Sequence, residues 1–188
     1  MGQIGANDLK AGLKVEIDGE PYNIISVELV KPGKGQAFTR TRVKHLLSGK
    51  LLERTFKSNE SLPEADVEET KMRLLYRESD GFVFMDDKSF EQLSIPLSII
   101  GDKEVYMMEE ILYDLIIYKG AVADVIPPTF LNMKIKETSP GVKGDTASGR
   151  VLKPAITETG AKIQIPIFVE EGELVKVDTR TGEYVSRV

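Results

Sequence analysis

The sequence predicts an all-β protein built from three small β-barrel domains. Apolar and polar residues alternate with a period of two along most of the chain, as they do in half-buried strands. The alternating segments are short, and pairs of residues typical of tight turns separate them, such as Asp18-Gly19, Ser48-Gly49 and Lys119-Gly120. Short strands punctuated in this way are typical of a small barrel.

Two segments divide the chain into three parts. Residues 59–64, with the sequence NESLPE, have the composition of a linker, and Pro127-Pro128 cannot lie inside a central strand. The predicted domains are therefore 1–64, 65–128 and 129–188. Each is small for a stable core, so we expect neighbouring barrels to support one another.

Each domain is expected to contain about four strands. In the first domain they are expected at 15–17, 22–30, 36–47 and 51–56. In the second they are expected at 67–76, 82–85, 112–118 and 121–126, with an irregular or helical piece near 90–100. The run 112–118 is short enough to be helical, but Lys119-Gly120 behind it favours a strand. In the third they are expected at 130–137, 163–169, 174–178 and 184–188, with a loop at 139–149.

The composition argues against catalysis and metal binding. The chain has no cysteine and one histidine, His45, whose neighbours are those of a strand residue. Transition-metal sites would need carboxylates alone, and acidic pairs adjacent in sequence point to opposite faces of a strand. We therefore expect neither an enzyme nor a metal or cofactor site. No run approaches the ~18 apolar residues of a membrane span, and a signal-peptide core is missing, so a cytoplasmic protein is expected.

The net charge of −5 is unevenly distributed. Domain 1–64 has 10 lysines and arginines against 8 acids, 65–128 has 6 against 14, and 129–188 has 9 against 8. The stretch 31–57 alone holds eight of these cations, with Glu53 as its one acid. Such a surface attracts phosphate even on an acidic protein, although a solvated strand face has the same composition.

The strand expected at 36–47 sorts its residues by parity. One face carries Gln36, Phe38, Arg40, Arg42 and Lys44, whereas the residues between them are small or apolar enough to pack. Fork-shaped guanidinium groups on a rigid strand suit a phosphate backbone, but charges that keep an open strand from pairing would look similar. The candidate RNA-binding residues are Lys31, Arg40, Arg42, Lys44 and Lys57.

The stretch VKPGKGQAF, from Val30 to Phe38, places one lysine between two glycines. Pro32-Gly33 fits the central positions of a type II turn, and Gly33 and Gly35 remove side-chain bulk on both sides of Lys34. We expect Lys34 to stand alone at a hairpin tip, able to enter a narrow place and open to an enzyme that modifies its amine. The alternative is that glycine and lysine are there for solubility.

The glycine-rich segment 144–149 lacks the Gly-Lys-Ser/Thr ending of a phosphate-binding P-loop. It is expected to be a flexible hairpin loop. Its backbone N–H groups could also contact RNA.

Seven stretches spread along the chain carry a family resemblance. In order they are AGLKVEIDGEPY, VKPGKGQAF, LLERTFKS, Pro127-Pro128, PGVKGDTASG, TGAKIQIP and VKVDTRTGEYVSRV. Together they resemble bacterial translation elongation factor P over essentially the full length. The resemblance implies a KOW/SH3-like barrel followed by two OB folds, in an L-shaped, tRNA-like arrangement. It also implies a non-enzymatic factor that binds the ribosome between the P and E sites and relieves stalling at consecutive prolines.

The resemblance further implies roles for single residues. Lys34 occupies the place of the functional tip lysine, which is commonly extended, as by β-lysine, and reaches the CCA end of the P-site tRNA. Gly144, Asp145 and Thr146 match a loop near the E-site codon, and Tyr184 and Arg187 match residues that face the small subunit. After that loop the chain departs from the family pattern, with Ser148-Gly149-Arg150-Val151-Leu152 in place of a second glycine cluster.

The implied partners are both ribosomal subunits, the P-site peptidyl-tRNA, the mRNA at the E-site codon and a lysine-modifying enzyme, with the protein acting as a monomer. One alternative is a general KOW/OB-type RNA-binding protein in which Lys34 is incidental. Another is a divergent paralogue that acts on other arrest motifs.

Overall fold

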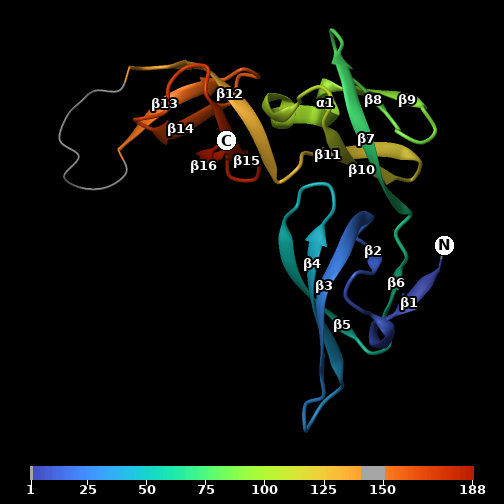
Figure 1. Ribbon diagram of the computed structural model, residues 1–188. Coiled ribbons are helices and arrows are strands. Elements are labelled where there is room, and N and C mark those ends of the chain that lie inside the picture. Colours follow the sequence, from blue (N-terminus) through green and yellow to red (C-terminus); the bar gives the residue numbers. More distant parts are fainter. Residues whose placement is uncertain (1, 141–150) are drawn as a thin grey trace. The chain divides into compact units, whose positions relative to one another are not determined.

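A computed structural model describes residues 2–140 and 151–188 (Figure 1). In these residues the chain forms strands β1 to β16, one four-residue helix, α1 (Leu97–Ile100), and two 3-10 helices, η1 (Ala6–Asp8) and η2 (Gly101–Tyr106). The strands form three barrel-like sheets and one two-stranded pair, which confirms the all-β prediction. Contacts between Cα atoms divide the chain into two compact units, 1–70 with 115–124 and 71–114 with 125–188.

The N-terminal sheet has the strand order β2-β3-β4-β5, with each strand antiparallel to the next. The bounds are β2 (Lys14–Ile17), β3 (Glu20–Val30), β4 (Phe38–His45) and β5 (Leu51–Lys57). The four predicted strands are thus confirmed, with ends that shift by two residues at most. Asp18 and Gly19 between β2 and β3 both have positive φ, 54° and 81°, as the Asp-Gly pair predicts for a tight hairpin turn.

A β-bulge interrupts the pairing of β3 with β4. The register shifts between Ile24 and Ser26, and the bulged residue Ile25 is 41% exposed. Before the bulge Tyr22 and Ile24 are buried, whereas beyond it Ser26 and Glu28 are exposed. The extra residue therefore moves the even-numbered residues of β3 from the inner to the outer face of the sheet.

The predicted linker 59–64 is wrong in its second half. Residues Ser61–Pro63 form β6, which pairs antiparallel with β1 (Gln3–Gly5) and places Leu62 opposite Ile4. Leu62 is 8% exposed and belongs to the N-terminal hydrophobic core. A single apolar residue between a serine and a proline gives no periodicity from which this strand could be predicted.

A hydrogen-bonded cluster ties the hairpin 115–124 to the rest of its unit. The Tyr118 hydroxyl donates to Glu16 Oε1 at 2.6 Å, and Lys119 Nζ lies 2.8 Å from the same oxygen. The Lys119 N–H also donates to the Asp66 carbonyl at 3.0 Å. The hydrogen bonds from Lys119 and Tyr118 lower the pKa of Glu16, whose side chain is 13% exposed.

The middle sheet has the strand order β11-β10-β7-β8-β9. The bounds are β7 (Val67–Arg77), β8 (Gly81–Met85), β9 (Gln92–Pro96), β10 (Leu112–Tyr118) and β11 (Ala121–Ile126). The four predicted strands are confirmed. The irregular or helical piece near 90–100 is wrong in its first part, because Gln92–Pro96 forms an edge strand, and right in its second part, where α1 follows.

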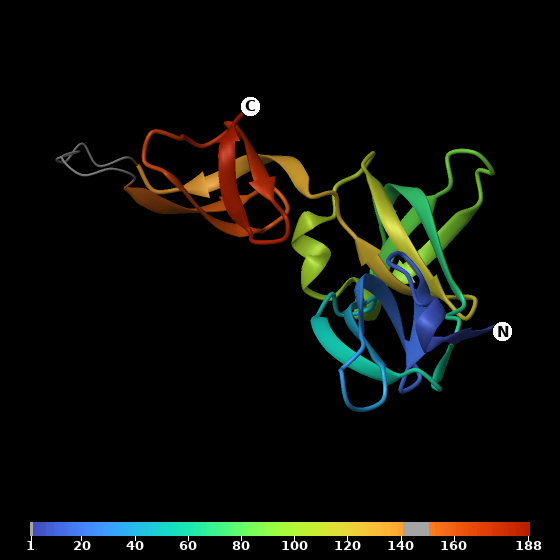
Figure 2. The same ribbon diagram turned by 90° about the horizontal axis from the view of Figure 1, so that it is seen from below.

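The C-terminal sheet has the strand order β14-β13-β12-β15-β16, coloured orange to red in Figure 2. The bounds are β12 (Phe130–Thr138), β13 (Leu152–Thr157), β14 (Lys162–Pro166), β15 (Leu174–Asp178) and β16 (Glu183–Arg187). Strands were predicted at or near four of these positions, but not at β13. Its inward residues are Lys153, Ala155 and Thr157, which give no apolar alternation.

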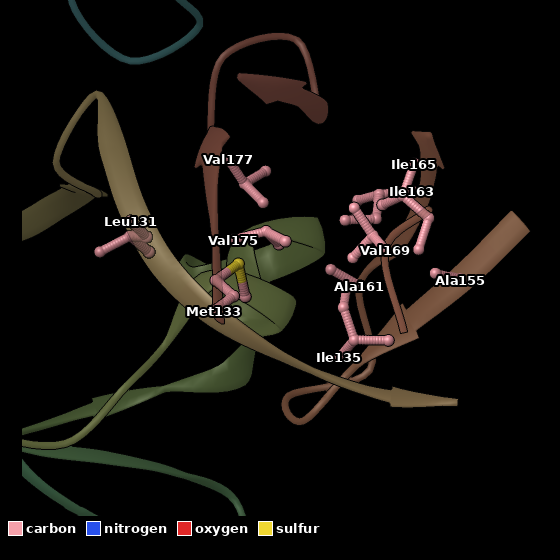
Figure 3. Packing of buried hydrophobic residues seen from close by; sticks show 10 residues of the cluster. All are labelled: Leu131, Met133, Ile135, Ala155, Ala161, Ile163, Ile165, Val169, Val175 and Val177. Carbon is pink, nitrogen blue, oxygen red and sulfur yellow. The ribbon is translucent and has the colours of Figure 1, made fainter. Parts of the chain in front are cut away.

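Apolar side chains from the inward face of this sheet converge in one core (Figure 3). Met133, Ile165 and Val175 have no exposed surface, and burying a side chain of this size contributes about 1.5–3 kcal/mol. Partly buried residues of the segment 105–111 pack against this core, and the Thr159 hydroxyl donates to the Val105 carbonyl at 2.5 Å. Residues of the predicted domain 65–128 thus pack against the core of 129–188, as the small size of each domain predicts.

We expect the Glu16→Gln variant to be less stable than wild type at neutral pH. Because folding lowers the pKa of Glu16, its stabilisation is present above the unfolded carboxyl pKa, about 4.3, and is lost as the pH falls through the folded-state pKa. Denaturant unfolding measured from pH 7 to pH 3 should show the two stabilities converging. Asp18→Asn, on the next turn, is the control, and a difference that does not shrink as the pH falls would contradict the assignment.

Thr39 and Thr41 on β4 offer a matched test of buried hydrogen bonding. Both are 1% exposed, but Thr41 Oγ1 donates to the Arg54 carbonyl at 3.0 Å, whereas Thr39 Oγ1 has no partner among the described residues. We expect Thr41→Val to lower the free energy of unfolding by about 1 kcal/mol, and Thr39→Val to leave it unchanged or raise it. Equilibrium denaturation measures both, and a larger loss at Thr39 would overturn this interpretation.

Candidate nucleic-acid interface

The loop 31–37 joins β3 to β4 at the far end of their hairpin, the blue loop at the bottom of Figure 1. It begins beyond the residue pair Val30–Phe38. Lys34 lies at its centre and is exposed, as are Pro32, Gly33 and Gly35 around it. Within residues 2–140 and 151–188 the Lys34 ammonium makes no hydrogen bond or ion pair. The lysine therefore stands alone at a hairpin tip, as the sequence predicts.

The predicted type II turn at Pro32-Gly33 is wrong. Such a turn needs positive φ at Gly33, but the positive φ of this loop, 121°, is at Gly35. A Cβ built at Gly33 would meet no atom within 4 Å, and one at Gly35 would lie 3.7 Å from Pro32 Cγ. The conformation of the chain therefore requires glycine at Gly35, whereas nothing in the described residues requires it at Gly33.

The two faces predicted for the strand at 36–47 are confirmed. Arg40, Arg42 and Lys44 are exposed, while the residues between them, Thr39, Thr41 and Val43, are buried. Successive cations lie about 7 Å apart along the strand. The exposed Lys57, on β5 opposite Phe38, extends the basic face formed by Arg40, Arg42 and Lys44, and Lys31 is exposed in the loop beyond it.

Two acids share this basic face. The strand register places Glu28 opposite Arg40 and Glu53 opposite Arg42. Arg40 Nη1 lies 3.6 Å from Glu28 Oε2, with side chains that are 50% and 67% exposed. Exposed pairs of this kind contribute about 1 kcal/mol or less, so a phosphate can replace the carboxylate at little cost. The stretch 31–57, in which Glu53 is the one acid, does not include Glu28, because Glu28 reaches this face from β3.

Ser58 holds the base of the tip loop, a role that no sequence pattern predicts. Its hydroxyl donates to the Ala37 carbonyl at 2.8 Å, and its own carbonyl accepts from Asn7 Nδ2 at 3.3 Å. The N–H of the preceding Lys57 donates to Glu60 Oε2 at 2.7 Å. These bonds fix the end of β5 beside Ala37, the last residue of the tip loop.

His45, at the other end of β4, is partly buried, as expected of a strand residue. Its Nδ1 lies 2.6 Å from Ser48 Oγ, its Nε2 lies 3.3 Å from Glu20 Oε2, and its ring centroid lies 4.9 Å from that of Tyr22. Among the described residues no group of three or more histidines and acids could hold a metal ion. None of the helices in that part of the chain has the length and apolar character to span a membrane.

The remaining candidate residues lie in the C-terminal sheet or outside the described residues. Tyr184 on β16 packs against the C-terminal core. Arg187, on the same strand, forms an ion pair with Glu173 and lies 5.8 Å from the centroid of the Phe168 ring. Gly144, Asp145 and Thr146 lie outside the described residues.

Three family models match successive parts of the chain. The elongation factor P (EF-P) KOW-like domain matches residues 5–62, the EF-P OB domain matches residues 67–125, and the EF-P C-terminal domain matches residues 131–187.

Full-length relatives agree with these matches. A protein of Protochlamydia amoebophila described as elongation factor P 2 is 60% identical over 188 residues, which cover 100% of this chain and 99% of that protein. A protein of Chlamydia caviae with the same description is 54% identical over the same coverage. Among solved structures, a translation initiation factor eIF-5A family protein of Naegleria fowleri has a TM-score of 0.51 and 18% identity, covering 66% of this chain and 95% of that one. That likeness shows the fold alone.

The basic face predicts RNA binding that weakens with salt. Each phosphate that a cation neutralises adds about 0.7–0.9 to the slope of log binding constant against log salt concentration. We expect Arg42→Gln to lower this slope by about one such contact, and Lys10→Gln, an exposed lysine outside the basic face, to leave it unchanged. Fluorescence anisotropy with a labelled tRNA acceptor hairpin measures the slope. Equal slopes for Arg42→Gln and wild type would contradict the interface.

Proposed function

This chain belongs to the elongation factor P family of translation elongation factors, and on that premise we propose that it binds the ribosome between the P and E sites. There it stimulates peptide-bond formation and relieves stalling at consecutive prolines. The observation that carries the proposal is the exposed Lys34, which has no partner among the described residues and lies at the end of a hairpin whose outer face is cationic.

The physical task of such a factor is orientation. The proline ring restricts its backbone, which makes it a poor nucleophile and a poor peptidyl donor. Holding reacting groups in place supplies up to about 7–11 kcal/mol in well-oriented intramolecular reactions. A tenfold gain in rate needs only about 1.4 kcal/mol. A modest restriction of the CCA end of the P-site tRNA is therefore enough.

Lys34 is the group proposed to make that restriction. Its ammonium has no partner in the described residues and is open both to RNA and to a modifying enzyme. Extension by a group such as β-lysine would lengthen the side chain and add a second cation near the tRNA backbone. The open space beside Gly33 would let RNA approach the loop closely.

The proposal gives the rest of the N-terminal hairpin the role of an anchor. Arg40, Arg42 and Lys44, with Lys31 and Lys57, would hold the acceptor arm of the tRNA by charge. The acidic segment 65–128, with 14 acids against 6 cations, repels phosphate, so we propose that its contacts are mainly with protein or with few tRNA groups.

The remaining proposed contacts are with the mRNA and the small ribosomal subunit. Gly144, Asp145 and Thr146 would lie near the E-site codon of the mRNA, and Tyr184 and Arg187 would face the small subunit. The protein would work in the cytoplasm as a monomer, without a cofactor, and would be the substrate of a lysine-modifying enzyme.

A second candidate is a general RNA-binding protein with KOW-like and OB domains in which Lys34 is incidental. The observation that favours it is the basic face, which would bind RNA with or without the tip. A paralogue that acts on other arrest motifs is a variant of the first proposal.

The test is synthesis of a Pro-Pro-Pro peptide on purified ribosomes with protein purified from its native host. We expect wild type to raise the rate at least tenfold, and Lys34→Ala to lose this gain because no cation then reaches the CCA end. Lys34→Arg, which keeps the charge but removes the amine that is modified, should lose most of it. Mass spectrometry of the wild-type protein should show added mass on Lys34.

Lys10→Ala is the control for loss of an exposed lysine and should act as wild type does. If Lys34→Ala works as well as wild type while Arg40→Gln and Arg42→Gln do not, the general RNA-binding reading replaces the first one. If no variant differs and wild type does not accelerate synthesis of this peptide, the assignment to proline stalling is overturned.

A further inference from the structure

Phe90 combines two unfavourable features at one position. It lies in the loop 86–91 at the end of the β8–β9 hairpin (Figures 1 and 2). Its surface is 69% exposed, the largest fraction among the large hydrophobic residues that the structure describes. Its φ is 61°, in the left-handed region that a bulky side chain rarely occupies. An asparagine or glycine here would relieve the strain and would not expose a large apolar surface to water.

The loop imposes this conformation through its own hydrogen bonds. Asp86 Oδ1 accepts from the N–H groups of Lys88 at 2.7 Å and Ser89 at 2.9 Å. The Asp86 N–H donates to the Glu91 carbonyl at 3.0 Å, and the Phe90 N–H donates to the Asp86 carbonyl at 2.9 Å. The bonds from Ser89 and Lys88 lower the pKa of Asp86, which keeps its carboxylate charged. The Phe90 ring is thus presented from a fixed backbone.

The base of the loop is held as firmly. Arg73 on β7 donates to both carboxylate oxygens of Asp87, at 2.9 Å and 2.6 Å, and to the Glu110 carbonyl at 2.6 Å. A loop fixed in this way loses little conformational entropy when a partner binds, which favours affinity.

The charges around Phe90 decide between classes of partner. The loop carries Asp86, Asp87 and Glu91 against Lys88. At its base Arg73 compensates Asp87, and Glu110 adds a further acid, so the surface keeps a net negative charge. This surface repels phosphates and attracts lysine and arginine. An exposed aromatic ring also attracts these cations to its face. A few buried anchor side chains supply most of the binding energy of a protein–protein interface, and a rigid, exposed aromatic ring can serve as such an anchor once a partner covers it.

We propose that the loop 86–91 is a docking site for a lysine- and arginine-rich protein segment, with the Phe90 ring as its apolar anchor. The inference rests on the proposed function in that the segment belongs to a protein of the ribosome. It gives the acidic segment 65–128 a contact of its own, separate from the contacts proposed for Lys34 and the basic face.

The first test separates binding from folding. Phe90→Asn places a residue that tolerates positive φ at position 90, so the melting temperature should stay the same or rise, while the Kd for purified ribosomes should rise at least tenfold. Phe90→Tyr, which keeps the ring, should bind as wild type does. Asp18→Asn, which also puts asparagine at a positive φ, is the control and should leave the Kd unchanged. An unchanged Kd for Phe90→Asn would overturn the proposal, whether or not the melting temperature falls.

The second test identifies the partner. A benzoyl-phenylalanine placed at position 90 of the full chain is irradiated on purified ribosomes, and the adduct should resist ribonuclease and be lost on proteolysis. An adduct with RNA would overturn the proposal in favour of a base stacked on the ring. The same probe at Gln36, beside the tip, reports the proposed function. A cross-link at position 36 without one at 90 would sink this inference alone, and none at either would sink both.

Discussion

The register of the β3–β4 hairpin is the constraint on which the candidate interface depends. Val43 has no exposed surface and lies opposite Ile24 on one side and Leu52 on the other. A slip by one residue would turn Val43 to solvent and would point Arg42 into the core without a partner, which is strongly unfavourable. The outward row of cations is therefore a consequence of core packing, and the position of Lys34 follows because the same ladder ends at Val30 and Phe38.

The bulge at Ile25 modifies this row in a way that bears on RNA binding. It turns Glu28 to the outer face, where it pairs weakly with Arg40. A well-formed buried pair would have to be broken before Arg40 could bind phosphate, but an exposed pair at 3.6 Å contributes little. Such a carboxylate lowers the repulsion between Arg40 and Arg42 in the free protein and would give way to a phosphate in the proposed complex. The presence of acids on the face is thus compatible with binding.

The local sequence predicts those strands whose inward residues are apolar. It does not predict a strand whose inward residues are polar and are bonded by partners distant in the sequence. The inward Lys153 of β13 is 6% exposed because its Nζ donates to the Ser139 carbonyl at 2.8 Å, a partner that no local pattern reveals. For the site, the Pro and Gly residues predict the tip but not its turn type, since either Gly33 or Gly35 could take the positive φ. Neither the Glu28 contact nor the conformation of Phe90 has a signal in the sequence, because the first depends on a bulge in β3 and the second on the hydrogen bonds that close the loop 86–91.

The fold accounts for some residues of the β3–β4 and β8–β9 hairpins and leaves others unexplained. Gly35 is required by its φ of 121°, and Thr41 by its bond to a neighbouring strand. Gly33 has open space around it, Lys34 has no partner in the described residues, and Phe90 is where folding alone would disfavour it. When the fold does not require a residue, or when the residue strains the backbone, binding of another molecule beside it can explain its presence. Because one loop follows a cationic face and the other is acidic, the two proposed partners differ in kind, a phosphate backbone at the first and a basic protein at the second.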